Sequence, residues 1–409
     1  MASTINTNVI SLNAQRNLSN SQSSLAVSMQ RLSSGLRVNS AKDDAAGLAI
    51  AERMNTQVKG LTVGARNSND GISLAQTAEG ALGKVGDMLQ RMRELAVQAS
   101  NATNSVADRA ALQAEVAQLR DEVDRVAKQT TFNGTKILDG SFSGAVFQVG
   151  ANSGDNITVG ALVNTTATGL AHIAYAYDKQ TAIVGSSVTD LTQITDPSAL
   201  RIDDGTTTWD LGAIKSASSG TERMGQMIEA INRKSADTGV TAFLTKEIDG
   251  NFTIDIMSSR LTSLGDAQTM TLTGFNATNF GYVPTSVGAT GGTVVNATDT
   301  STDALGIDTL TVDTQAHAWV ALKKIDSAID QVNGARASLG ALQSRFESSV
   351  ANIEIQVENL AASRGRIVDA DFAMETANLS RTQILQQAGT AMVAQANKLP
   401  QSVLQLLQQ

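Results

Sequence analysis

Side chains able to do acid–base or metal chemistry are few and scattered in this sequence of 409 residues. There are two histidines, His172 and His317, and no cysteine, so disulfides and thiolate metal sites are excluded. Two histidines this far apart are better interpreted as unrelated surface or packing residues than as a metal pair. The sequence also lacks the His-Glu-x-x-His motif of zinc peptidases. We therefore expect neither a metal nor a cofactor.

Aspartate clusters are the remaining candidates for chemistry. Asp43 and Asp44 have carboxylate side chains, which could act as a pair in acid–base chemistry or bind a cation. A helix N-terminus, where negative charge is favoured by roughly 0.3–1 kcal/mol, explains them better. Asp203-Asp204-Gly205 and Asp249-Gly250 are typical of turns. The sequence has no phosphate loop, nucleophile elbow or dinucleotide fingerprint, so no enzyme activity is predicted.

Composition narrows the function classes further. The net charge of −8 argues against a nucleic-acid binder. No apolar run approaches the roughly 20 residues that a membrane-spanning helix needs, so we expect no membrane insertion. The N-terminus lacks the basic and apolar regions of a cleaved secretion signal, so an exported protein would need another route. Aromatic residues make up 3% of the chain, which favours an aliphatic core between helices.

Two series of residues, each repeating every seven positions, predict a long helix with a coiled-coil seam near the C-terminus. One series is Leu322, Ile329, Arg336, Gln343, Val350 and Val357, and the other is Ile325, Val332, Leu339, Phe346, Ile353 and Leu360. The N-terminal half carries a matching series: Leu74, Ala78, Ala81, Val85, Met88, Met92, Leu95 and Ala99. A third helix is predicted from Leu112, Val116, Leu119, Val123 and Val126, with Ser105 and Asp108 in capping-box spacing. These three helices should pack as a bundle.

The region from about 133 to 310 differs in kind, because it is rich in Thr, Gly, Asn and Ser. Asn133-Gly134 and Asp139-Gly140 predict turns beside short strands at 135–138 and 145–149. A helix at about 222–234, flanked by strands at 199–203, 240–245 and 252–257, predicts a small α+β module. The predicted fold class is therefore mainly α with an inserted α+β region: an elongated helical rod from both chain ends, a β-hairpin region and a variable outer domain.

The two ends of the chain are amphipathic but nearly uncharged. Arg16 is the only charged side chain in residues 1–30, and Lys398 is the only one in residues 382–409. Such faces suggest burial among copies of the same chain, because an unpaired buried charge is costly. We expect terminal segments that fold on assembly. The predicted assembly residues are Leu18, Leu25, Leu32, Leu385, Met392, Leu399, Val403, Leu404, Leu406 and Leu407.

Three parts follow from these patterns. Residues 1–42 and 363–409 are predicted to be paired terminal helices, and residues 43–178 and 310–362 a helical rod with a β-hairpin region. Residues 179–309 are predicted to be the outer α+β domain.

Several long motifs, in the right order and spacing, resemble those of bacterial flagellins. They are RLSSGLRVNSAKDDAAGLAIA at 31–51, NDGISLAQTAEGAL at 69–82, FNGTKILDG at 132–140, FQVGAN at 147–152, RIVDADFA at 366–373 and QQAGTAMVAQAN at 386–397. Gly365 stands where the family commonly has Ser, which suggests a flexible connector there.

The resemblance implies a structural subunit of the flagellar filament that leaves the cell through the flagellar type III apparatus and self-assembles for motility. It implies an export chaperone, the filament cap, hook-associated proteins and a host flagellin receptor as partners. A hook–filament junction protein shares the terminal pattern and is the alternative, although it does not usually keep the full motif run at 132–152. A coiled-coil surface adhesin would explain the heptads but not seams contributed by opposite chain ends.

The segment from Gln90 to Val97 also resembles the patch that the flagellin-sensing Toll-like receptor grips. That resemblance implies a contact surface for the receptor or a neighbouring subunit, formed by Gln90, Arg91, Glu94, Leu95 and Glu115. Met92 and Leu95 belong to the predicted helix seam, so packing alone already explains part of this segment.

Overall fold

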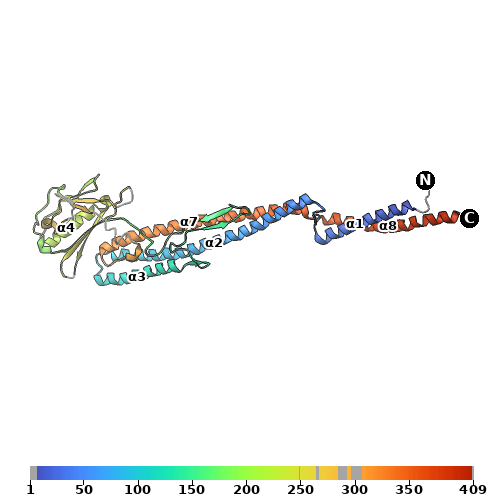
Figure 1. The fold of residues 1–409 in the computed structure, drawn as a ribbon. Helices are drawn as coiled ribbons and strands as arrows, with labels where there is room; N and C mark the ends of the chain where they lie inside the picture. Colours follow the sequence, from blue (N-terminus) through green and yellow to red (C-terminus); the bar gives the residue numbers. More distant parts are fainter. Residues whose placement is uncertain (1–6, 248, 264–266, 284–292, 296–305, 408–409) are drawn as a thin grey trace. The chain divides into compact units, whose positions relative to one another are not determined.

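The computed structural model describes residues 7–247, 249–263, 267–283, 293–295 and 306–407, with the backbone alone at 293–295 and 399–407. Its long helices are α1 (Val9–Ser34), α2 (Ala45–Ala99), α3 (Val106–Gln129), α7 (Gln315–Val368) and α8 (Phe372–Leu407). A segment of short strands lies between α3 and α7 in the chain (Figure 1). This arrangement confirms the predicted fold class. No described helix is long and apolar enough to cross a membrane.

The chain divides into two compact units. The terminal unit comprises Met1–Gly71, Val146–Ile157 and Arg345–Gln409, and the central unit comprises Ile72–Ala145 and Thr158–Ser344. Helices α2 and α7 each contribute residues to both units. The terminal unit therefore joins sequence from both ends of the chain with one hairpin from its middle.

Burial along α2 differs in part from the predicted seam. Ala78, Val85, Met92 and Ala99 are fully buried as predicted, whereas Ala81 and Met88 are half-buried and Leu82 and Leu89 take the buried positions. The reason is that α2 meets two partners in the central unit. Arg91 pairs with Glu115 of α3, and Arg93 pairs with Asp326 of α7. A helix that packs on two neighbours buries a wider face than a two-stranded seam does.

Helix α7 confirms one of its two predicted series. The buried series is Ile325, Val332, Leu339, Phe346 and Ile353, with Leu360 half-buried. In the other series Arg336 is exposed and the rest are half-buried, while Ala321, Ala328 and Leu342 are buried instead. The expected flexible connector at Gly365 is wrong, because α7 continues as a helix to Val368. Intrahelical hydrogen bonds hold a single glycine in place at a modest cost.

Local chemistry sets the start of α3 and the first hairpin. Ser105 accepts the backbone N–H of Asp108 at 3.2 Å while the Asp108 carboxylate accepts the backbone N–H of Ser105 at 2.9 Å, which confirms the capping box. Asn133 and Gly134 both have positive φ, 48° and 78°, and form the two-residue turn between β1 (Thr131–Phe132) and β2 (Thr135–Lys136). The predicted turn is thus confirmed.

A second hairpin, β3 (Ala145–Gln148) and β4 (Asn156–Val159), brings its turn onto α2 within the terminal unit. At Gly64 a Cβ would run into the Val149 carbonyl, and at Gly71 it would lie 2.6 Å from the Phe346 ring. Only glycine permits these two approaches. The Phe346 ring also meets Phe147 edge-on, with centroids 5.5 Å apart.

The middle of the central unit contains two antiparallel sheets, and each sheet has strands both before and after the predicted helix in the sequence. One has the order β5 (Ala176–Ile183), β9 (Phe252–Ser258), β8 (Val240–Lys246), and the other β11 (Thr293–Val295), β10 (Met270–Thr273), β6 (Arg201–Asp203), β7 (Thr208–Asp210). Helix α4 (Gly220–Arg233) packs on β8, where Asn232 exchanges two hydrogen bonds with the Ala242 backbone at 2.8 and 2.7 Å. The predicted α+β module is confirmed. Strands β5, β7 and β10 were not predicted.

This module has its own apolar core. Met224, Met227 and Ile231 of α4 are fully buried against Ile254 and Ile256 of β9. All members of that core lie between residues 176 and 282. The module thus holds itself together with residues from one continuous stretch of chain.

Where the module rejoins the helices, Asp308 and Gly306 contact elements outside it. The backbone N–H of Asp308 donates to the Ala167 carbonyl at 3.1 Å, and its carbonyl accepts from Arg120 of α3 at 3.0 Å. A Cβ at Gly306 would collide with the Ala167 carbonyl. The chain entering the module near 170 and the chain leaving it at 306 are therefore neighbours.

Asp313 and His317 form a hydrogen-bonded pair at the start of α7, which begins at Gln315. Asp313 Oδ1 lies 2.6 Å from His317 Nδ1, and Thr314 Oγ1 accepts the backbone N–H of His317 at 3.0 Å. The hydrogen bond to Asp313 raises the pKa of His317 despite partial burial, and the same bond lowers the pKa of Asp313. His317 is therefore a packing residue of the helix start, as interpreted from the sequence.

These shifts predict how the pair responds to pH. A raised His317 pKa stabilises the fold fully below about pH 6.5, the ordinary histidine value, and this contribution is lost as pH rises through the folded value. The lowered Asp313 pKa contributes above about pH 4 and is lost as pH falls. Asp313→Asn should lower the NMR titration midpoint of the His317 ring, with His172→Gln used to assign the two signals. An unchanged midpoint would show that the pair does not form in solution.

Candidate assembly and contact surfaces

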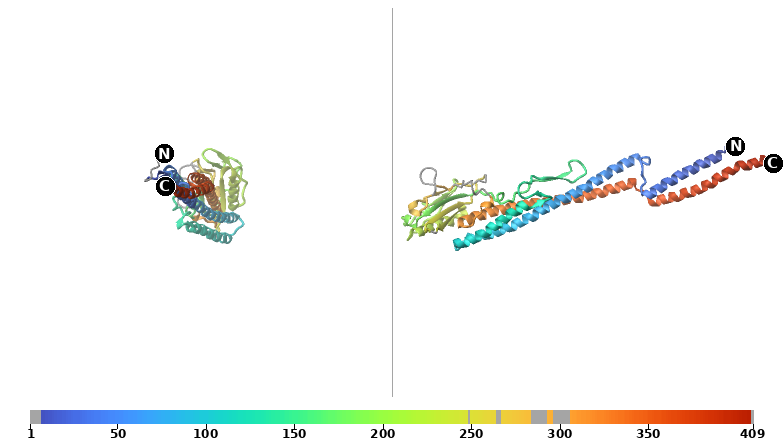
Figure 2. Two further views of the ribbon diagram at one scale, coloured as in Figure 1. Left: turned by 90° about the vertical axis from the view of Figure 1, so that its right-hand side faces the viewer. Right: turned by 60° about the horizontal axis from the view of Figure 1, so that its bottom comes forward.

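Helices α1 and α8 lie antiparallel and side by side in every view (Figures 1 and 2). Hydrogen bonds fix one end of the pair: Asn8 Nδ2 donates to the Ala396 carbonyl at 2.8 Å, and Ser11 Oγ donates to Asn397 Oδ1 at 2.6 Å. At the other end Arg31 lies 4.0 Å from the Glu375 carboxylate, which is 9% exposed. These polar contacts set the register of the two helices.

The seam between α1 and α8 consists mainly of small side chains. Its buried members are Ser11 and Ser28 of α1 and Glu375, Thr382 and Ala396 of α8. A Cβ at Gly389 would lie 3.1 Å from Leu18 Cδ1, so the helices approach closely there. Small residues bring two backbones together but bury little apolar area.

The predicted assembly residues divide between this seam and the outer faces. Leu18, Leu25 and Leu32 are half-buried, whereas Leu385 is 49% and Met392 is 62% exposed. Sequence reasoning missed Val9, Ile10 and Ile384, which are 61–66% exposed on the same two helices. The side chains of Leu399, Val403, Leu404, Leu406 and Leu407 lie outside the described residues.

Two linkers fasten the terminal pair to the adjoining ends of α2 and α7. The backbone N–H of Arg37 donates to the Val368 carbonyl at 2.6 Å, and that of Ala370 donates to the Gly35 carbonyl at 2.9 Å. Val38, Ala51 and Val368 form a small buried cluster beneath these bonds. Both chain ends are thus clamped where they leave the longer helices.

The segment at 90–97 forms an ion-pair network on the surface of the central unit. Arg91 donates from Nη1 to Glu94 at 2.8 Å and from Nε to Glu115 at 2.9 Å, and these two carboxylates raise its pKa. The Arg91 side chain remains 51% exposed. Four of the five predicted contact residues, Gln90, Arg91, Glu94 and Glu115, thus lie together in the fold.

Leu95 differs from the other four, because it is 1% exposed and belongs to the core of the helices. Its side chain offers no surface to a partner. Val97, which is 48% exposed, is the apolar group that the segment presents instead. The burial of Leu95 agrees with its predicted place on the helix seam and not with a contact role.

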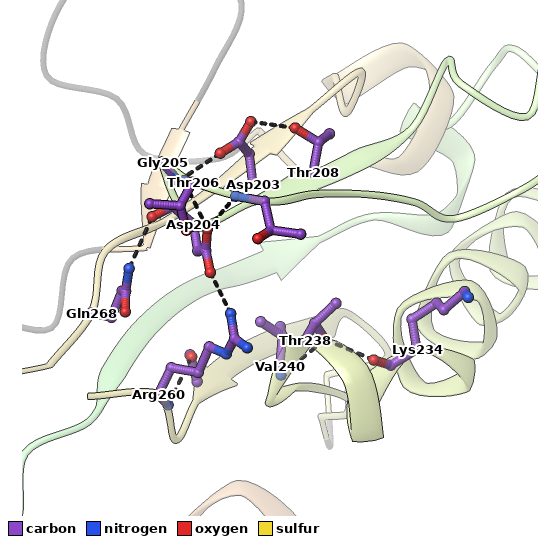
Figure 3. A network of polar contacts seen from close by, with 12 residues as sticks. Asp203, Asp204, Gly205, Thr206, Thr208, Lys234, Thr238, Val240, Arg260 and Gln268 are labelled. Carbon is purple, nitrogen blue, oxygen red and sulfur yellow. Dashed lines mark hydrogen bonds and ion pairs between the residues drawn. The ribbon is translucent and has the colours of Figure 1, made fainter. Parts of the chain in front are cut away.

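The aspartate clusters are used in turns and helix starts, as interpreted from the sequence. Figure 3 shows the Asp204 carboxylate accepting from the Thr206 backbone and pairing with Arg260. Burial acts to raise the Asp204 pKa, but these bonds hold it below its usual value. Arg260 in turn lies 4.7 Å from the Trp209 ring centroid.

Asp43 and Asp44 precede the first residue of α2, Ala45. Asp43 accepts three hydrogen bonds from Asn39 and Ser40, and Asp44 accepts the Gly47 backbone N–H at 2.8 Å. Their placement confirms the helix N-terminus.

Comparison with known proteins identifies the family. A family model described as the bacterial flagellin N-terminal helical region matches residues 5–143, and one for the C-terminal helical region matches residues 322–407. Flagellin E of Vibrio cholerae is 38% identical over 413 residues, and the B-type flagellin of Pseudomonas aeruginosa is 36% identical over 494 residues, each covering the full length of both chains.

Among solved structures, FliC from Burkholderia pseudomallei is 27% identical with a TM-score of 0.37, covering 68% of this chain and 100% of that one. Full-length identity to flagellins favours the filament subunit over the junction-protein alternative. The chain belongs to the flagellin family, the extracellular structural subunits of the bacterial flagellar filament.

Proposed function

We propose that this flagellin polymerises through the exposed apolar faces of its paired terminal helices. The observation that carries the proposal is that Val9, Ile10, Ile384 and Met392 are each more than 60% exposed on α1 and α8. Burying one such side chain stabilises a contact by roughly 1.5–3 kcal/mol. Several of them together supply a strong drive for association between copies.

The lack of charge on these helices supports the same proposal. Arg16 is the only charged residue of α1 before Arg31, and Lys398 is the only one of α8 after Arg381. An ordinary solvated helix carries many more. Serine, asparagine and glutamine side chains enter an interface at much lower desolvation cost than lysine or glutamate. The surfaces are therefore suited to burial between subunits.

Removing two exposed apolar groups tests the proposal. Leu385→Ser combined with Met392→Ser should abolish or strongly reduce filament formation while the monomer keeps its helical circular dichroism, because neither side chain is buried. Gln387→Ser with Gln395→Ser, two exposed polar positions on the same helix, is the matched control. Electron microscopy and sedimentation measure polymer. Filaments of normal length from the Leu385/Met392 variant would contradict the proposal.

Partners other than the chain itself follow from the same exposed surface. We propose that an export chaperone covers these helices before assembly, and that the chain leaves through the flagellar type III apparatus. The filament cap and hook-associated proteins would meet the same faces at the ends of the polymer. Because the family is structural, we propose an assembly role without enzyme activity.

The Arg91 network is proposed as a contact for a host flagellin receptor or for a neighbouring subunit. Its support is geometric: Gln90, Arg91, Glu94 and Glu115 form one exposed patch across α2 and α3. Ion pairs this exposed contribute only about 0–1 kcal/mol to stability. A central arginine in a partner's interface often contributes much more than that.

Comparing alanine variants of Arg91 and Arg93 separates an effect on receptor contact from an effect on monomer stability. Arg91→Ala should change monomer stability by no more than about 0.5 kcal/mol yet sharply reduce receptor activation by monomer. Arg93→Ala is the control, because its side chain is similarly exposed, at 49%, and pairs with Asp326 of α7 rather than with α3. Thermal melting and a reporter-cell assay give the two readouts. If both variants signal equally well, the patch is not the contact surface.

We further propose the three-part division at 1–42 and 363–409, 43–178 and 310–362, and 179–309. The self-contained core at 176–282 supports a separate outer module. Two details suggest that the outer domain begins and ends a few residues earlier than predicted. Strand β5 begins at Ala176, and the Asp308 carbonyl accepts a hydrogen bond from Arg120 of α3. The neighbouring backbones at 170 and 306 meet the requirement of a tolerated insertion.

Replacing residues 174–304 with a short Gly/Ser linker tests that division. The helices should still fold and filaments should still form, because the entry and exit points of the module lie side by side. Trp319 and Val320 lose their cover from Tyr175 and Met257, so some loss of thermal stability is expected. Circular dichroism and electron microscopy measure the outcome. A variant without helical structure would place the module in the core of the fold.

A further inference from the structure

One flank of the α1–α8 pair carries an apolar groove. Its volume is about 440 Å³, and its lining includes Val9, Ile10 and Leu18 of α1 and Leu385, Ala388 and Met392 of α8. All of these residues belong to the terminal unit. The groove is open to solvent, and Leu385 and Met392 on its α8 side are 49% and 62% exposed.

An exposed aromatic side chain, Phe372, forms a knob elsewhere on α8. Phe372 is the first residue of α8 and is 65% exposed, which makes it the one aromatic ring among the large exposed apolar side chains of the described residues. Phe372 and Met392 are separated by a helical rotation of roughly 160°. The knob and the groove therefore lie on different sides of α8.

The two features cannot meet within one chain. Phe372 and Ala388 are on one continuous helix, so their axial separation is roughly 24 Å at 1.5 Å per residue. A buried phenylalanine is one of the largest apolar contacts available, and the groove has room for such a ring. Phe372 can therefore enter a groove of this kind only on another copy of the chain.

A second copy of this chain is the occupant that the geometry favours. A contact between two different surfaces of the same molecule is heterologous, and it builds an open helical polymer instead of a closed dimer. A knob on one side of α8 and a groove on the other provide that asymmetry. The lining of the groove contains no charged residue, which suits an apolar ring such as that of Phe372.

We propose that Phe372 of each subunit inserts into the α1–α8 groove of a neighbouring subunit. This contact rests on the proposed function, assembly through the terminal helices, and names the pair of surfaces that meet. Neighbouring copies with parallel α8 helices would then be displaced by roughly 24 Å along the helix axis.

A disulfide test is direct because the chain has no cysteine of its own. The double variant Phe372→Cys, Ala388→Cys is polymerised under reducing conditions and then oxidised. Only thiols whose Cα atoms approach within about 7 Å form a bond, so an intrachain bridge is excluded. We expect a ladder of covalent dimers, trimers and longer species on a denaturing gel from filaments, and none from monomer.

The matched control is Phe372→Cys with Gln387→Cys. Gln387 is also exposed and adjoins Ala388 in sequence, but it is rotated by roughly 100° away from the groove. Filaments that give no ladder, or the same ladder in both variants, overturn the Phe372 contact while leaving assembly intact. Failure of the unsubstituted chain to polymerise counts against the proposed function instead.

Two further measurements cover the case in which the double variant does not polymerise. Single variants Phe372→Cys and Ala388→Cys are mixed with an excess of unsubstituted chain, and oxidised filaments should contain cross-linked dimers of the two. Phe372→Ala should raise the critical concentration for polymerisation roughly tenfold. Mixed filaments without dimers, together with an unchanged critical concentration, overturn the contact.

Discussion

The close pairing of α1 with α8 along a seam of small side chains is the constraint on which the rest of the structure depends. Because Ser11, Ser28 and Gly389 occupy the seam, Leu385 and Met392 of α8 are left exposed, while the leucines of α1 at 18, 25 and 32 are half-buried. The pair buries little apolar area of its own and relies on polar contacts for register, such as Asn8 to Ala396. Under the proposed assembly, the terminal helices would gain further packing from neighbouring copies.

Sequence patterns located the secondary-structure elements well, but they did not determine which side chains each helix buries. The seven-residue series located α2 and α7, and Asn133-Gly134 located the first turn. The sequence did not separate Leu82 from Ala81 in α2, because a helix with two partners has a wide buried face. Likewise, the apolar stripe of α8 did not indicate which of its side chains meet α1, where Thr382 and Ala396 are buried. An amphipathic pattern indicates that one face of a helix packs against another surface, but it does not indicate whether that surface belongs to the same chain.

The surface network around Arg91 shows why candidate contact residues need the fold. Arg91 and Glu115 are 24 positions apart, and only the packing of α3 on α2 brings them together. Leu95, which the sequence placed both on the helix seam and in the contact patch, lies in the core. Exposed ion pairs add little to stability, so the fold tolerates changes in this network. A surface of this kind is free to change without loss of the helical scaffold beneath it.

The lack of charge on α1 and α8 also affects how contacts between these helices respond to the salt and pH of the surroundings. Interactions between charged groups weaken as salt accumulates, since the Debye length falls from about 10 Å at 0.1 M to about 3 Å at 1 M salt. An ion pair is also lost when its carboxylate is protonated. Leu385 and Met392 have nothing to screen or titrate, whereas the Arg31–Glu375 pair between the same two helices does. Under the proposed assembly, contacts made by the two apolar side chains would keep their strength when a swimming cell passes between fresh and saline surroundings.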